Sequence, residues 1–258
     1  MTEKLLMEMR GHTALITINV PAANTWDAEN LLALRDLVIK LNKDDNCYSL
    51  VITGQGDKFF SAGADLNMFA SGDKDMARSL ANHFGDAFET LSNFRGVSIA
   101  AINGYAMGGG LECAMACDIR IAETQAIMAL PEATVGLLPS GLGTQHLSWL
   151  VGEGWAKRMI LCGERIDAEK AEKIGLVEEV VERGASLEAA LNLAGKVEKQ
   201  SPKSVSACKR LIQKARSGVM TEAYNTERDE FVALFDTQDQ KEGVQAFLEK
   251  RKPEWKNA

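Results

Sequence analysis

Two glutamates are candidate acid–base groups, because each lies in a stretch that otherwise holds small or apolar residues. Glu112 follows the run Gly108–Leu111, and Glu132 follows Pro131. A buried carboxylate costs free energy unless it is paired or used in chemistry. Burial and mutual repulsion raise the pKa of one of two neighbouring acids, so one keeps its proton while the other is ionised. The alternative is a structural role, in which each carboxylate lies at the positive end of a helix or in a turn.

Glycine-rich segments accompany these acids. Asn103–Cys113 reads N-G-Y-A-M-G-G-G-L-E-C, and Phe60–Leu66 reads F-S-A-G-A-D-L. The first lacks the G-x-G-x-x-G spacing of a dinucleotide loop and the Lys-Ser/Thr ending of a phosphate loop, and no G-x-S-x-G nucleophile elbow is present. Glycines that open a helix leave backbone N–H groups free at its positive end. We therefore expect either an anion or oxyanion site of backbone donors or close packing of a strand on a helix.

The elements that must position these residues follow an α/β pattern. Short β-branched strands are predicted at residues 14–20, 49–53, 98–102 and 119–122, and a helical apolar stripe runs over residues 30–41. Strands that alternate with helices favour a largely parallel sheet. After Asp167 helical patterns dominate: Asp167 and Gly175 bound one helix, and Ser201-Pro202 begins another. Two more helices are expected near residues 221–235 and 240–250. The apolar face of the helix that begins at Ser201-Pro202 is predicted to comprise Val205, Cys208, Leu211, Ile212 and Ala215. Residues 1–200 are therefore predicted to form an α/β core, and residues 201–258 a helical region that packs on the core and on neighbouring subunits.

Composition excludes several classes of function. The 258 residues carry 29 Lys+Arg and 36 Asp+Glu, a net charge of 29 − 36 = −7, which argues against nonspecific nucleic-acid binding. No apolar run approaches the roughly 20 residues that span a bilayer, so no membrane partner is expected. The five cysteines and three histidines are scattered, which predicts neither disulfides nor a metal site. A cytoplasmic location is expected.

The order of four motifs resembles the crotonase (enoyl-CoA hydratase/isomerase) superfamily. F-S-A-G-A-D-L is followed by A-A-I-N-G-Y-A-M-G-G-G-L-E, then by L-P-E-A-T-V-G, then by G-T-Q-H-L, and the C-terminal E-G-V-Q-A-F-L-E-K-R-K-P is similar as well. The resemblance covers nearly the whole chain. It implies a spiral of ββα units with a C-terminal helical trimerisation region, and a homotrimer or a dimer of trimers.

The resemblance also implies a reaction. The thioester carbonyl of an acyl-CoA would accept hydrogen bonds from the N–H groups of Ala64 and Gly109, an oxyanion hole for an enolate. Glu112 and Glu132 match the two glutamates of the hydratases, which hold a water against the β-carbon of a trans-2-enoyl-CoA. Which glutamate is the base and which is the acid stays open. Coenzyme A enters as part of the substrate, and no resident cofactor is implied.

Further residues match positions that contact the substrate in relatives. Backbone groups of Ala62–Leu66 would recognise the adenine of coenzyme A, Phe231 would lie near the acyl pocket, and Phe247 and Lys250 would reach coenzyme A from a neighbouring chain. The substrate-binding residues implied in this way are Ala62, Ala64, Asp65, Leu66, Gly109, Ser140, Phe231, Phe247 and Lys250.

The chain departs from the family pattern near the acyl pocket. Where P-G-x-G-G-T is common, it reads Pro139-Ser140-Gly141-Leu142-Gly143-Thr144, and where N-A-L is usual it reads Asn24-Thr25-Trp26. A branched, aromatic or heteroatom-substituted acyl group therefore stays open beside a straight chain. The alternatives to hydration are double-bond isomerisation, dehalogenation or decarboxylation on the same scaffold, or a non-catalytic acyl-CoA- or protein-binding module.

Overall fold

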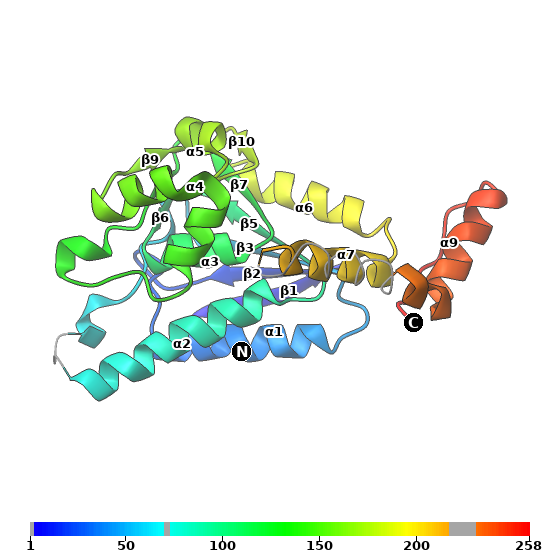
Figure 1. Cartoon of the computed structure of the whole chain (residues 1–258), viewed down its shortest axis with the longest axis horizontal. Helices are drawn as coiled ribbons and strands as arrows, with labels where there is room; N and C mark the ends of the chain where they lie inside the picture. Colours follow the sequence, from blue (N-terminus) through cyan, green and yellow to red (C-terminus); the bar gives the residue numbers. More distant parts are fainter. Residues whose placement is uncertain (1–2, 70–72, 217–230) are drawn as a thin grey trace.

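The computed structural model describes residues 3–69, 73–216 and 231–258. Within these ranges a six-stranded sheet runs in the order β1-β2-β3-β5-β7-β10 (Figure 1). Only the β1–β2 pair is antiparallel in this sheet, as the alternation of strands and helices predicts. The strands are β1 (Leu5–Arg10), β2 (Thr13–Ile18), β3 (Ser49–Gly54), β5 (Val97–Ile102), β7 (Ile119–Glu123) and β10 (Glu179–Val181).

The two faces of this sheet bury different cores, because successive side chains of a strand point to opposite faces. In β3, Leu50 and Ile52 belong to the larger core, whereas Val51 belongs to the smaller one. The larger core is covered by α1 (Ala28–Asn42) and α2 (Lys74–Ser92), and the smaller core by α6 (Ser186–Val197) (Figure 1). Covering both faces makes the central strands continuously apolar rather than alternating.

A second sheet carries the loops of interest. It runs in the order β4-β6-β8-β9, with bounds Phe59–Ser61, Tyr105–Met107, Ile127–Ala129 and Ile166–Asp167. Each of β3, β5 and β7 is followed, after a short connection, by β4, β6 or β8, and these three short strands pair in parallel. The segments that follow β4, β6 and β8 therefore leave the same edge of the second sheet together.

The remaining helices begin and end largely where the sequence indicates. The Asp167 side chain caps α5 (Ala168–Ile174), which ends at the left-handed Gly175, and Ser201 caps α7 (Pro202–Lys214). In Figure 1, α9 (Gln238–Leu248) stands apart beyond α7. A helix expected near residues 221–235 lies mostly outside the described residues. The other elements are η1 (Leu66–Phe69), α3 (Gly109–Ala116), η2 (Glu132–Val135), α4 (Gly143–Leu161) and η3 (Leu234–Asp236).

The predicted apolar face of α7 is not the face that the core buries. Cys208 is exposed and Ile212 is 67% exposed, whereas Pro202 and Ala207 are the buried residues of the helix. Helical periodicity identified an apolar stripe but not the surface that it meets. The division at residue 200 stays a prediction. In the described part of the chain, no helix is both long and apolar enough to cross a bilayer.

Asp118 ties α7 to the main sheet. Its Oδ2 accepts hydrogen bonds from the N–H of Ser98 at 2.8 Å, from the Ser98 hydroxyl at 2.9 Å and from Lys209 Nζ at 2.7 Å. Ser98 belongs to β5, and Lys209 lies on α7 with only 10% of its side chain exposed. One carboxylate therefore joins a central strand, the end of α3 and a C-terminal helix.

Asp118→Ala is expected to lower the free energy of unfolding by about 2–3 kcal/mol, because it leaves the buried Ser98 amide without its acceptor and the largely buried Lys209 ammonium without its carboxylate partner. Urea unfolding followed by circular dichroism measures this. The control is Asp57→Ala, which removes an exposed ion pair with Arg183 and should change stability by less than about 0.5 kcal/mol. Equal losses in the two variants would contradict the structural role of Asp118.

Candidate active site

The segments that follow β4, β6 and β8 surround a cavity of about 230 Å³. Both predicted acids line it, although they are 20 positions apart in the sequence, and so do residues of η1, η2 and the segment before α4. The pairing of the three short strands explains why residues so far apart meet here. Of the remaining predicted site residues, those that line the cavity are Ala62, Ala64, Leu66, Gly109 and Ser140.

Glu112 is buried in the first turn of α3 and is held by two backbone amides. Its Oε1 accepts hydrogen bonds from the N–H groups of Gly141 and Gly143, both at 2.8 Å. A Cβ at Gly143 would lie 2.7 Å from the same oxygen, and a Cβ at Gly141 would lie 3.0 Å from Oε2. The amides reach the carboxylate only because both residues are glycines. Sequence reasoning missed this role, although the signal is the G-x-G that precedes α4.

Glu132 is the first residue of η2, and its side chain lines the same cavity beside the backbone of Gly108. A Cβ at Gly108, whose φ is +51°, would lie 2.9 Å from Glu132 Oε1, so both the backbone conformation and the space there require glycine. The other oxygen, Oε2, is buried and has no hydrogen-bond partner among the described residues. A buried oxygen without a partner calls for a proton, a water or a substrate.

Burial raises the pKa of both acids and so favours their uncharged, protonated forms. It raises the pKa of Glu112 to about 8, with a further contribution from the negative charge of Glu132, while the two glycine amides oppose the shift. Burial likewise raises the pKa of Glu132 to about 7. Near neutral pH Glu112 therefore favours its protonated form more strongly than Glu132 does. Such a difference allows one carboxyl to donate a proton while the other accepts one.

Two backbone amides are free at the wall of this cavity. Around Ala64, Trp26 N–H donates to Gly63 O and Asp65 N–H donates to Trp26 O, so the N–H of Ala64 itself points away from this bridge. Gly109 is the first residue of α3, and its N–H has no acceptor within the helix. Neither amide has an acceptor among residues 3–69, 73–216 and 231–258.

The loops that carry these amides are in contact. Gly63 has a φ of +92°, and a Cβ there would lie 2.6 Å from Met107 O and 3.3 Å from Gly109 N. The backbone before Ala64 therefore touches the start of α3, and both N–H groups belong to one wall. Two free amides at the positive end of a buried helix can stabilise a developing oxyanion.

Asp65, Phe231 and Lys250, which are also predicted site residues, do not line the cavity. Asp65 Oδ1 accepts hydrogen bonds from the backbone and side-chain nitrogens of Asn67, so this carboxylate closes the turn into η1. Phe231 is 63% exposed and packs on Phe235, and Lys250 is exposed as well. The side chain of Phe247 lies outside the described part. Their contacts with a substrate, from this or a neighbouring chain, stay predictions.

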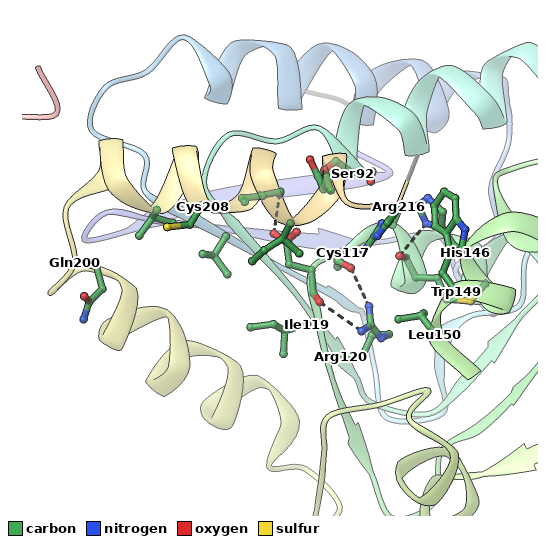
Figure 2. A pocket seen from close by; sticks show the side chains of 18 of the residues that line it. Ser92, Cys117, Ile119, Arg120, His146, Trp149, Leu150, Gln200, Cys208 and Arg216 are labelled. Carbon is green, nitrogen blue, oxygen red and sulfur yellow. Dashed lines mark hydrogen bonds and ion pairs between the residues drawn. The ribbon is translucent and has the colours of Figure 1, made fainter. Parts of the chain in front are cut away.

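A larger cavity of about 460 Å³ lies elsewhere, between α7 and the C-terminal end of α3 (Figure 2). The polar groups around it are engaged with each other: Lys209 with Asp118, His146 Nδ1 with Met115 O. Its size does not make it the reaction site, because its titratable groups have structural partners. Across the described residues, no group of three or more His, Cys, Asp or Glu is arranged to hold a metal ion.

Comparison with known proteins agrees with the resemblance in the motifs. The sequence pattern of the family described as "Enoyl-CoA hydratase/isomerase" matches residues 8–258. The chain belongs to the enoyl-CoA hydratase/isomerase family. Among family members it is 38% identical, over 98% of both chains, to a protein of Escherichia coli K12 named 2,3-dehydroadipyl-CoA hydratase. It is also 38% identical to the crotonyl-CoA hydratase of Syntrophomonas wolfei, over 97% of this chain and 96% of that protein.

One solved structure is more similar in sequence than these two relatives. The structure titled Pseudomonas aeruginosa DspI is 66% identical and superposes with a TM-score of 0.97, covering 99% of this chain and 97% of that one. The structure titled enoyl-CoA hydratase from Bacillus anthracis is 33% identical and superposes with a TM-score of 0.95, covering 99% of this chain and 100% of that one. The crotonase-like α/β fold expected from the motifs is confirmed.

Removing one acid is expected to change the other. In Glu132→Gln the pKa of Glu112 should fall, because the neighbouring negative charge that raises it is gone, yet it should stay above 4.5 because burial is the larger cause. Carbon-13 NMR titration of side-chain carboxyl-labelled protein measures this pKa. Glu153→Gln, at an exposed pair with Lys157, is the control and should leave it unchanged. An unchanged pKa in Glu132→Gln would mean that the two acids do not interact.

Proposed function

We propose that this protein catalyses the reversible hydration of trans-2-enoyl-CoA thioesters to 3-hydroxyacyl-CoA. One observation carries the proposal: two carboxyls whose pKa values are raised by burial line the same cavity as two backbone amides that have no acceptor among the described residues. The names of the relatives, which include hydratases of crotonyl-CoA and 2,3-dehydroadipyl-CoA, support it.

The two amides stabilise the charge that develops in the reaction. The thioester oxygen accepts hydrogen bonds from the N–H groups of Ala64 and Gly109. When water adds to the β-carbon, electron density moves through the α-carbon to this oxygen as an enolate forms. Donors fixed in position before the reaction bind the enolate more strongly than the neutral carbonyl, which lowers the barrier.

The two acids supply and remove the protons. A water held between Glu112 and Glu132 loses a proton to the ionised carboxylate as its oxygen bonds to the β-carbon. The protonated carboxyl gives its proton to the α-carbon, which restores the thioester carbonyl. One water is consumed, one acid has gained a proton and the other has lost one. The reverse reaction therefore uses the same two groups with their roles exchanged. Either glutamate can take either role in this scheme.

The walls of the cavity favour an uncharged acyl group. Leu66, Phe69 and Phe84 line one side, and Val135, Leu137 and Leu138 line the η2 side. The charged residues that line it, within the described chain, are the two glutamates. A second carboxylate on the acyl chain would be desolvated there without a cation to pair with, which costs free energy.

Coenzyme A and neighbouring chains complete the proposal. The backbone of Ala62–Leu66 is proposed to bind the adenine, with Lys250 and Phe247 contributed by another copy of the chain in a trimer or dimer of trimers. More than half of the Phe231, Val232, Phe235 and Val244 surfaces is exposed, which supports burial in an assembly. We propose a cytoplasmic location, and no cofactor besides the coenzyme A of the substrate.

The test is hydration of a panel of enoyl-CoA thioesters, followed by loss of the conjugated-thioester absorbance. Trans-2-hexenoyl-CoA should be hydrated with a kcat/KM at least ~10-fold above that of 2,3-dehydroadipyl-CoA, which has the same six carbons and an added carboxylate.

Glu112→Gln and Glu132→Gln should each lower kcat by ~100-fold or more, since each removes a positioned acid or base. No hydration of any thioester by the wild type, or near-normal rates in both variants, would overturn the proposal.

The oxyanion role of Gly109 is tested by two matched substitutions. Gly109→Ala and Gly109→Pro both add a Cβ that meets Phe84, 2.8 Å from its ring, but only proline removes the N–H. Proline is compatible with the first residue of a helix. The kcat of Gly109→Pro should lie a further ~100-fold or more below that of Gly109→Ala, the loss expected for one oxyanion donor. Equal rates in two folded variants would show that this amide takes no part.

A further inference from the structure

Phe88 lies directly behind the cavity without lining it. Its side chain is fully buried on α2, and its ring packs edge-on against Trp26, with centroids 5.7 Å apart, and against Phe84, at 5.8 Å. Aromatic pairs in this geometry are well-defined contacts that resist sliding. Phe88 is thus the middle ring of a row of three.

The ring also presses on the residue that holds Glu112. A Cβ at Gly141 would lie 2.7 Å from Phe88 Cδ2 and 3.0 Å from Glu112 Oε2. The ring and the carboxyl group therefore both pack against the side of Gly141 on which a side chain would project. The N–H of Gly141 donates to Glu112 Oε1 at 2.8 Å. Oε2 has no hydrogen-bond partner among the described residues, so it is the oxygen left for a water.

The two outer residues of the row contact the loops that carry the two amide donors. Phe84 lies against Gly109, where an added Cβ would be 2.8 Å from its Cε1. Trp26 holds the Ala64 loop through its backbone, by the hydrogen bonds with Gly63 and Asp65. The three residues of the row therefore contact the support of the acid and the loops of both amide donors, two of them through their rings and Trp26 through its backbone.

We propose that Phe88 is a positioning residue for the Glu112 carboxylate. Its ring keeps Gly141 against the carboxyl, which fixes Oε1 and leaves Oε2 directed to the cavity. The proposal rests on the proposed hydration, because Glu112 is its acid or base. A residue that acts in this way affects the reacting geometry rather than substrate binding, so its loss appears in kcat more than in KM.

A purely structural role would make Phe88 equivalent to other buried rings of the same core. Phe94 is the matched control, since it is fully buried in that core and contacts Gly96 and Lys209 rather than Gly141. Phe88→Leu and Phe94→Leu remove the same atoms and should lower stability to a similar degree. Phe88→Leu should lower kcat ~10-fold or more with KM within ~2-fold, whereas Phe94→Leu should keep kcat within ~2-fold.

A double-mutant cycle measures the contact itself. Gly141→Ala adds a methyl group where the Phe88 ring lies, so it should lower kcat strongly in the wild type. In the Phe88→Leu background the smaller, flexible side chain can move aside, and the same substitution should cost at least ~5-fold less. Losses that simply multiply, or an equal fall of kcat in Phe88→Leu and Phe94→Leu, would overturn the positioning role.

Hydrogen exchange at the Gly141 amide gives a readout that needs no substrate. This amide is hydrogen-bonded to Glu112, so its exchange, followed by NMR, should be ~10-fold or more faster in Phe88→Leu than in Phe94→Leu at matched stability. Equal exchange would overturn the proposal even if the enzyme is active. If the wild type hydrates no enoyl-CoA, the proposed function fails, while the exchange rates still decide whether Phe88 holds Gly141.

Discussion

The burial of the Glu112 carboxylate is the constraint on which the site depends. An isolated carboxylate in a protein interior is strongly unfavourable, and here two glycine amides offset part of that cost at one oxygen. The folded protein still favours the protonated acid, with a pKa of about 8. Between the ordinary pKa near 4.5 and this value, the folded chain holds a proton that the unfolded chain has lost, so Glu112 makes stability fall as the pH rises through this window. Burial of this acid therefore favours a protonated carboxyl at neutral pH, as the proposed hydration requires, and the large core must offset the resulting loss of stability.

The topology explains how such a site can be built from distant residues. Each of three central strands continues into a short strand of a second, parallel-paired sheet, so the segments after β4, β6 and β8 emerge side by side. The first brings one amide donor, the second brings the other donor and Glu112, and the third brings Glu132. Every one of these groups sits within a few residues of a paired strand or at the start of a helix. Their relative positions are therefore fixed by backbone hydrogen bonds before any substrate arrives, as electrostatic preorganisation requires.

Much of this was predictable because it is local. The strand at residues 98–102, the caps at Asp167 and Ser201, and two acids isolated in apolar runs can all be read from neighbouring residues. The contacts that aim Glu112 are not local: Gly141 and Gly143 lie 29 and 31 positions from it, and Phe88 meets Gly141 from another helix. Periodicity likewise predicted an apolar face on α7, yet the surroundings of a face are set by tertiary packing, and Ile212 is left exposed. Residue types indicate which groups are costly to bury, but the residues that pack against these groups are determined by the fold.

Chemistry and selectivity are carried by different parts of the cavity. The proposed reacting groups are backbone amides and glutamates, whereas the walls are side chains of η1, α2, η2 and the loop after η2, several of them exposed, such as Leu66, Val135 and Leu138. Exchanging wall side chains changes the acyl group that fits without moving an amide or an acid. Two relatives that are each 38% identical to this chain are named for acyl groups that differ by a terminal carboxylate and in length. Overall sequence identity therefore reflects the shared scaffold rather than the acyl group. The acyl group must be inferred from the few side chains that form the cavity walls, which in this chain are apolar.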